Sequence, residues 1–183
     1  MDLRVQRTRR SIINAFLELR SKKPLEKITV KELSEKALVN KATFYQHFSD
    51  IYELSEILED EVIEAIFNSI PHVNNLMENP RQGCRDLFEA LTSQNSLVDI
   101  LFSGNRQPHL IAKLEQKIKA DIYSGHPEYE GSLETEVFLT VLIQGNASAF
   151  SMYKNQDPQR VIEILGKITE CLTRECLQPP AQI

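Results

Sequence analysis

Hydrogen-bonding side chains crowd one short segment near the start of the chain. Between Asn40 and Phe48 the apolar positions are few, and the polar ones are Lys41, Thr43, Tyr45, Gln46 and His47. Lysine only donates hydrogen bonds, whereas the glutamine amide both donates and accepts them. We therefore predict that this segment forms a binding surface as well as contributing to a core.

Charge is divided unevenly along the chain. The 183 residues carry a net charge of −5, yet residues 1–48 hold 11 of the 21 Lys and Arg and only 5 of the 26 Asp and Glu. A basic segment attracts phosphate because its binding releases counterions, while an acidic remainder is repelled by the same polyanion. The N-terminal part is therefore predicted to bind a nucleic acid.

Two capping signals place the polar segment within a pair of short helices. Thr29 and Glu32 form the T-x-x-E pattern of a capping box, which predicts a helix from Val30 to Ala37. Asn40 is a favourable N-cap, so a further helix is expected from Lys41 to about His47. Two helices joined by so short a turn are typical of a helix-turn-helix.

The second of these helices has a packing side and a binding side. Phe44 and Phe48 are four residues apart and are expected to anchor it in a core. A helix-turn-helix lays its second helix in the major groove of DNA. Gln46 can bond two atoms of the adenine edge, and Ala42 is small enough to let the helix approach the bases. The residues expected to contact DNA are Thr29, Asn40, Lys41, Ala42, Thr43, Tyr45, Gln46 and His47.

These residues divide into two roles. Base reading is expected from Lys41, Thr43 and Gln46. Contacts to phosphate oxygens, which fix register without reading sequence, are expected from Thr29, Asn40, Tyr45 and His47. Arg4, Arg7, Arg9 and Arg10 form either a flexible arm on the DNA or a solvated helix face.

Residues 9–54 resemble the DNA-binding domain of TetR/AcrR-type bacterial transcriptional regulators. The matching motifs are Ile12-x-x-Ala15-Phe16, Ile28-Thr29-Val30-x-x-Leu33 and Val39-Asn40-Lys41-Ala42-Thr43-Phe44-Tyr45-x-His47-Phe48, which leads into Asp50. Two positions depart from the family pattern. Leu38 stands at a turn position where the family usually has glycine, so a slight distortion of the turn is expected. Ile51 stands where lysine is common, and Ser49 or a backbone N–H could replace the missing phosphate contact.

The remainder of the chain is predicted to be helical throughout. Leu, Ile, Ala, Glu and Lys occur in long stretches, and no alternating strand pattern persists. We expect an all-α protein of about nine helices, with a helix-turn-helix domain at 1–48 (motif 29–48), a linking helix at 50–69 and an effector-binding and dimerisation domain at 49–183. Helices are predicted at 3–20, 30–37, 41–47, 51–69, 81–91, 97–102, 108–123, 133–153 and 158–176, and residues 71–80 are predicted to form a loop.

The last two predicted helices carry a seam for helix packing. Apolar residues recur at three- and four-residue spacing in the last helix, and small residues in the helix before it permit close approach. The seam serves either the core of one chain or a dimer, and the resemblance implies a four-helix dimer interface. The residues assigned to it are Gly145, Ala149, Val161, Leu165, Ile168 and Leu172.

The middle helices carry apolar and aromatic residues that belong either to an ordinary core or to an effector pocket. The resemblance implies a small-molecule pocket, although the sequence itself does not locate it. The residues assigned to the pocket are Phe88, Leu91, Phe102, Leu110, Tyr123, Phe138 and Leu142. The linking helix is expected to be the only long element that joins both domains. Through it, a bound effector would alter the spacing of the two recognition helices of a dimer.

Several functions are not supported by the sequence. Cys84, Cys171 and Cys176 lack metal-ligand or redox spacing, and the histidines are scattered. No catalytic constellation stands out, so we expect neither an enzyme nor a bound cofactor or metal. The N-terminus lacks the pattern of a secretory signal, and the longest apolar run, 137–143, is too short to span a membrane, which predicts a cytoplasmic protein.

The expected function is that of a homodimeric transcriptional repressor, released from a palindromic DNA operator by a small-molecule effector. Two alternatives stay open at this point. The first is a ligand-independent nucleoid or cell-division factor on the same fold. The second is an all-α small-molecule binding protein or enzyme whose basic N-terminus is incidental.

Overall fold

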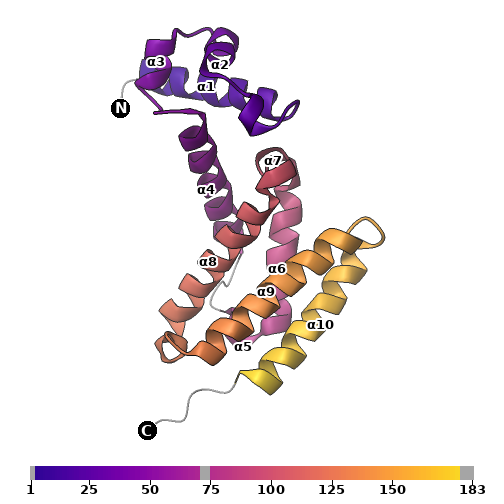
Figure 1. Ribbon diagram of the computed structural model, residues 1–183. Helices are drawn as coiled ribbons and strands as arrows, with labels where there is room; N and C mark the ends of the chain where they lie inside the picture. Colours follow the sequence, from indigo (N-terminus) through magenta and orange to yellow (C-terminus); the bar gives the residue numbers. More distant parts are fainter. Residues whose placement is uncertain (1–2, 71–74, 178–183) are drawn as a thin grey trace. The chain divides into compact units, whose positions relative to one another are not determined.

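The computed structural model describes residues 3–70 and 75–177, and within these ranges every regular element is helical, as predicted (Figure 1). Short 3₁₀ turns are formed by Leu25–Lys27, Gly104–Arg106 and Pro127–Tyr129. The α-helices are α1 (Leu3–Arg20), α2 (Val30–Ala37), α3 (Lys41–Tyr45), α4 (Ile51–Ser69), α5 (Asn75–Glu78), α6 (Pro80–Ser93), α7 (Asn95–Leu101), α8 (Gln107–Gly125), α9 (Leu133–Tyr153) and α10 (Pro158–Cys176).

Each of the nine predicted helices is found, and α1, α2, α4, α9 and α10 have the predicted ends. The ends of α6, α7 and α8 differ from the predicted ones by one or two residues, and two further details are wrong. α3 ends at Tyr45 rather than His47, because the Phe44 carbonyl accepts hydrogen bonds from both His47 N (2.9 Å) and Phe48 N (3.0 Å), which tightens the last turn. The predicted loop at 71–80 contains the four-residue α5, and its residues 71–74 lie outside the described ranges.

The chain forms two compact units. The first comprises Met1–Val62 and Asn95–Gln107, and the second comprises Ile63–Gln94 and Pro108–Ile183. α4 thus begins in the first unit and ends in the second. The chain also passes between the units before and after α7, so α4 is not the only place at which the chain crosses between them. The boundary at residues 48 and 49 stays a prediction of where the functional domains meet. The contacts between residues divide the chain at another place, within α4.

The core of the first unit is made by the apolar faces of its helices. Ile12 and Phe16 of α1, Leu33 of α2, Phe44 of α3 and Leu54 of α4 are completely buried. Burial of each such side chain stabilises the fold by about 1.5–3 kcal/mol. These five side chains fix α2 and α3 against α1, which gives the polar face of α3 a rigid support.

A buried ion pair fastens the inserted segment 95–107 to α4 within the first unit. Arg106 bonds both carboxylate oxygens of Glu59, with Nη2 at 2.6 Å from Oε2 and Nε at 3.0 Å from Oε1. The Glu59 side chain is fully buried, and it also accepts a hydrogen bond from Ser55 Oγ at 2.8 Å. Such a bidentate pair fixes orientation as well as charge.

A second arginine fastens the same segment to α1. The buried Arg20 donates from Nη2 to the carbonyl oxygens of Leu101 (3.3 Å) and Ser103 (2.9 Å). These carbonyls lie at and just after the end of α7, where helical hydrogen bonds run out. α7 is therefore held in the first unit, although the helices before and after it lie mainly in the second.

The second unit is built around the packing of α10 on α6 and α9. Cys84, Phe88, Ile162 and Leu165 form a buried cluster, and the rings of Phe88 and Phe150 lie 4.5 Å apart. α10 approaches α6 closely because it has a glycine at 166, where an added Cβ would lie 3.1 Å from the Arg81 carbonyl oxygen. In Figure 1, α9 and α10 run antiparallel as a helical hairpin.

A part-buried polar network joins α8 and α9. Lys119 Nζ lies 2.8 Å from both Glu115 Oε1 and Glu136 Oε2. Burial alone would raise the pKa of Glu115, but hydrogen bonds from Lys119, Thr140 and Gln144 lower that pKa to about 2. The pKa of Tyr123 is raised to about 12 by burial and by its 2.5 Å hydrogen bond to Glu136.

Candidate nucleic-acid interface

The two N-caps of the helix-turn-helix are formed as predicted. Thr29 Oγ1 accepts a hydrogen bond from Glu32 N at 3.2 Å, and Asn40 Oδ1 accepts one from Thr43 N at 2.7 Å. The carboxylate of Glu32 pairs with Lys23, so the expected capping box is formed on one side only. Both caps keep donors free for a ligand, namely the Thr29 hydroxyl hydrogen and the Asn40 amide Nδ2.

The turn between α2 and α3 depends on Leu38. This residue has φ 56° and ψ 41°, and among the described residues it is the one with a positive φ that is not glycine. The turn keeps the left-handed geometry that favours glycine, with Val39 N donating to the Ser34 carbonyl at 3.0 Å. The expected distortion of the turn is therefore absent. Leu38 itself adopts the unfavourable left-handed backbone, and its side chain is 92% exposed.

Leu38→Gly is expected to stabilise the first unit by about 1 kcal/mol, because it removes the left-handed strain and gives up almost no packing. Chemical denaturation of both proteins would measure the change. Lys31→Gly, at an exposed position inside α2, serves as the matched control and should destabilise by about 1 kcal/mol. Equal destabilisation by the two substitutions would show that Leu38 bears no strain.

α3 presents one apolar and one polar side. Phe44 and Phe48 are buried, and their rings lie 5.8 Å apart. Lys41, Ala42, Tyr45 and Gln46 are exposed, whereas Thr43 and His47 are half-buried. Because α3 is short, Gln46 and His47 lie in the turn that follows it.

The polar atoms of this surface are available for a ligand. Within the described part of the chain, the side chains of Lys41, Tyr45, Gln46 and His47 make no hydrogen bond or ion pair. The Tyr45 ring packs edge-on against Phe44 at 5.4 Å, which orients the phenol without engaging its hydroxyl. The surface is thus pre-positioned and unsatisfied, as a site that takes up an external hydrogen-bonding partner requires.

The start of α4 differs from expectation. Ile51 is buried in the core, and Ser49 N donates to the Glu53 carboxylate, so this N–H does not replace the missing lysine. Asp50 Oδ1 accepts from Glu53 N at 2.8 Å, which places two carboxylates at the helix start. Tyr52, 56% exposed, is a phenol on this turn that the sequence analysis missed. The polar residues near Tyr52 in the sequence are only a weak signal that it belongs to the binding surface.

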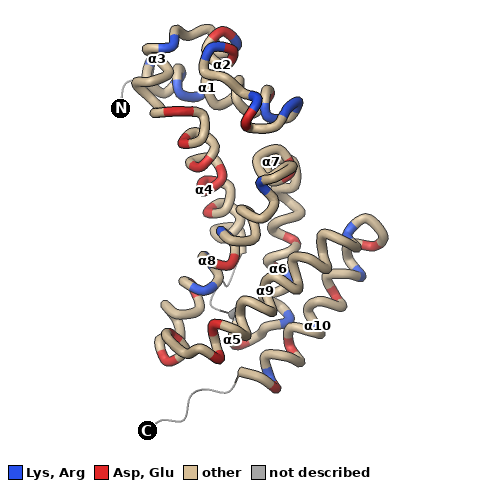
Figure 2. The backbone as a smooth tube through the Cα atoms, in the orientation of Figure 1, with Lys and Arg blue, Asp and Glu red and all other residues tan. Residues whose placement is uncertain are grey.

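The N-terminal arginines lie on α1 from residue 3 onward, which is the helix-face alternative. Arg9 pairs with Glu61 at 3.1 Å and lies over the Phe48 ring at 5.6 Å. It therefore links α1 to α4 and to the end of the recognition segment. Figure 2 shows Asp and Glu along α4, whereas α2 carries both charge signs.

The predicted pocket residues separate into two groups. Phe88, Leu91, Phe138 and Leu142 line a cavity in the second unit. Phe102 instead is buried in the first unit, Leu110 lies outside the cavity lining, and the Tyr123 hydroxyl is engaged by Glu136. These three residues were grouped with the others by apolar or aromatic character alone, which does not reveal which side of a helix faces the cavity.

The predicted dimer residues also separate. Ile168 and Leu172 are 45% and 38% exposed, Gly145 is exposed, and Ala149 and Val161 are half-buried. Leu165 is only 5% exposed because it packs inside the chain beside Cys84 and Phe88, so it is not part of the exposed seam. The sequence analysis missed Ile164, 44% exposed, although it continues the four-residue spacing of Ile168 and Leu172.

Neither a metal site nor a membrane span is found in the part of the chain that the structure describes. Among these residues, no group of three or more His, Cys, Asp or Glu is arranged to hold a metal ion. None of the described helices is both long and apolar enough to cross a membrane.

The capped α2, the left-handed turn and the exposed polar side of α3 define the first unit as a helix-turn-helix of the DNA-binding class. Residues 12–56 match the sequence pattern of the family described as bacterial regulatory proteins, tetR family. The matching residues include the whole helix-turn-helix of the first unit, so this part of the chain carries a DNA-binding domain of that type.

Two proteins resemble the chain over more than the matched domain. The chain is 26% identical over 124 residues to YxbF, an uncharacterized HTH-type transcriptional regulator of Bacillus subtilis (strain 168). The match covers 66% of this chain and spans about a third of that relative's length (33%). A solved Clostridium perfringens protein, provisionally named a fatty acid metabolism regulator, aligns with a TM-score of 0.55 and 20% identity over 87% of this chain and 97% of that chain, which supports the shared fold.

Proposed function

We propose that the protein is a sequence-specific DNA-binding transcriptional regulator that acts as a homodimeric repressor and is released from a palindromic operator by a small-molecule effector. The observation that carries the proposal is the exposed polar surface of α3 and the turn after it, where Lys41 and Gln46 have no partner among the described residues. Gln46 reads adenine, with Lys41 and Thr43 beside it. Thr29, Asn40, Tyr45 and His47 contact phosphates, and Ala42 permits close approach.

Dimerisation is supported by an apolar surface on the hairpin of α9 and α10. Ile164, Ile168 and Leu172 stand one helical turn apart on α10, and Val141 of α9 is 64% exposed. A groove of about 420 Å³ between the two helices, lined in part by Ala149 and Ile168, could receive side chains of a second copy. Pairing this surface with its own copy buries apolar area in a two-fold, four-helix arrangement.

Ile168→Glu is expected to raise the dimer dissociation constant by about 100-fold, because two unpaired carboxylates would be buried in each interface. Sedimentation velocity over a concentration series would measure it. Gln116→Glu adds the same charge at an exposed position on α8 and should leave the constant within about twofold. Identical sedimentation of the wild type and Ile168→Glu would exclude this surface.

The DNA-binding function is tested by gel-shift titration against genomic fragments. The wild type should select a small number of fragments and bind them with a steep salt dependence, and removal of one phosphate contact should lower the slope by about one unit. The titration is repeated with Gln46→Ala and Tyr45→Phe. Unchanged binding by both variants would remove α3 as the reading surface.

The route from effector to DNA passes through chain segments that belong to both units. α4 continues from the first unit into the second, and α8 enters the second unit directly after its first residue, Gln107. An effector that favours one position of these helices would change the spacing of the two recognition helices in the dimer. The coupling is reciprocal, so operator DNA should weaken effector binding by the same factor.

A further inference from the structure

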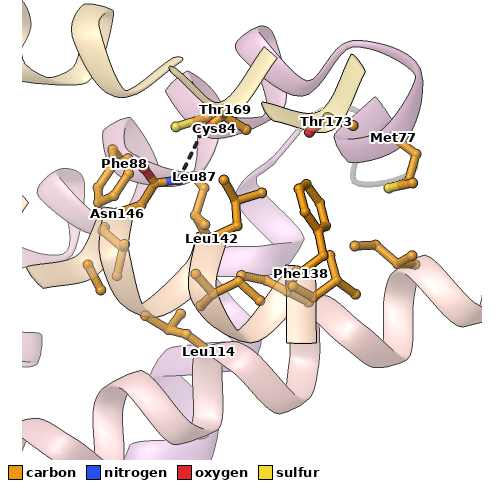
Figure 3. Close-up of a pocket in the computed structure, with 16 residues that line it drawn as sticks. Met77, Cys84, Leu87, Phe88, Leu114, Phe138, Leu142, Asn146, Thr169 and Thr173 are labelled. Carbon is orange, nitrogen blue, oxygen red and sulfur yellow. Dashed lines mark hydrogen bonds between the residues drawn. The ribbon is translucent and has the colours of Figure 1, made fainter. Parts of the chain in front are cut away.

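The second unit contains a partly open cavity of about 80 Å³ between α5, α6, α8, α9 and α10 (Figure 3). Leu114, Ile118 and Ile122 of α8 form one wall, and Phe138 and Leu142 of α9 stand beside them. None of the residues that line the cavity is Lys, Arg, His, Asp or Glu within the described part of the chain. The lining is therefore apolar with no fixed charge.

The cavity has polar groups on one side. Figure 3 places Thr169, Thr173 and Cys84 opposite Leu114, with Asn146 between α9 and α10. Asn146 Nδ2 donates to Thr169 Oγ1 at 2.9 Å. The amide has a second donor and a carbonyl acceptor for which the described residues supply no partner.

The cavity lining disfavours charged ligands relative to uncharged ones. A carboxylate or an ammonium group placed here would give up its hydration without gaining an opposite charge, and that cost is large. Burial raises the pKa of the Cys84 thiol to about 11, so the sulfur also carries no charge at neutral pH. A neutral hydroxyl, carbonyl or amide would instead recover a hydrogen bond at Asn146.

We propose that this cavity binds a small uncharged apolar molecule with one hydrogen-bonding group, which Asn146 receives while the α8 wall packs on the hydrocarbon part. The assignment rests on the proposed effector control and gives it a ligand class. The cavity is small, at about 80 Å³, and partly open, so slender short-chain molecules are suitable probes.

Three probes with the same chain separate the charge classes, namely 1-pentanol, pentanoate and pentylammonium. Methyl NMR titration of the free, full-length protein should show saturable shifts at Leu114, Ile118 and Leu142 with 1-pentanol. The two ions should bind at least tenfold more weakly. Pentanoate or pentylammonium binding as tightly as 1-pentanol would overturn the uncharged class.

Matched variants on α9 test the location. Ala147→Leu adds a side chain at a cavity-lining position, whereas Ser148→Leu adds the same side chain at the next position, outside the cavity lining. Binding of 1-pentanol should fall at least tenfold in the first and stay unchanged in the second. If Ala147→Leu does not give a folded spectrum, Leu142→Phe replaces it. Unchanged binding in the folded cavity variant would overturn the assignment.

A further variant tests the polar anchor. Asn146→Leu should weaken 1-pentanol binding several-fold, and unchanged affinity would refute the role of the amide. These titrations contain no DNA. Absence of 1-pentanol binding would therefore contradict the cavity assignment without affecting the proposed operator binding. Binding of 1-pentanol that leaves operator affinity unchanged would support the cavity and contradict the effector part of the proposed function.

Discussion

Arg106→Ala is expected to lower the free energy of unfolding of the first unit by about 3–5 kcal/mol. The substitution removes the partner of a fully buried carboxylate, and an uncompensated buried charge costs this much. Urea denaturation of the full-length chain would measure it. The destabilisation should be accompanied by release of the segment 95–107, since Arg106 is its ionic link to α4.

Two further variants test whether the loss of stability comes from the unpaired buried charge. Arg160→Ala breaks an exposed pair with Glu163 at 3.0 Å and should cost about 1 kcal/mol or less. The double variant Arg106→Met with Glu59→Leu removes both charges and should recover much of the stability. A cost for Arg106→Ala no larger than that of Arg160→Ala would contradict the buried-pair interpretation.

Gln46→Ala is expected to weaken operator binding by about 2–6 kcal/mol. A bidentate contact to a base is worth about 1–3 kcal/mol, and a two-fold dimer presents Gln46 twice. The effect should be largest for operators with adenine at the contacted position, so that the variant discriminates less between bases there. Fluorescence anisotropy with the selected operator and its single-base variants would measure both effects.

The matched control is Gln116→Ala, which removes the same amide from an exposed position on α8. Operator affinity and base preference should both be unchanged in this protein. Tyr45→Phe should differ from both, because removing a phosphate contact weakens binding to all sequences about equally. Reduced affinity of Gln46→Ala without any change in base preference would contradict its role as a base reader.

The local signals of the sequence were sufficient for most of the fold. Thr29 and Asn40 predicted the starts of α2 and α3 because a cap depends only on the next three residues. The end of α3 depends instead on two N–H groups that compete for the Phe44 carbonyl. The apolar periodicity of the sequence does not encode these two hydrogen bonds.

Side-chain direction in the second unit was harder to predict. Leu165 and Ile168 differ by three positions and share apolar character, yet the first is buried and the second is exposed. Tyr123 was predicted to line the pocket, but it lies outside the cavity lining and donates its hydroxyl to Glu136 of α9. In each case, contacts with residues distant in the sequence determine how the side chain is buried or bonded.

The central claim is that two copies of α3 read a palindromic DNA site. Hydroxyl-radical footprinting of the wild-type protein on a selected genomic fragment tests it most directly. We predict two protected half-sites of related, inverted sequence, about one DNA turn or a small multiple of it apart, with no protection by Gln46→Ala at the same protein concentration. A single continuous footprint without inverted symmetry, or equal protection by Gln46→Ala, would contradict the claim.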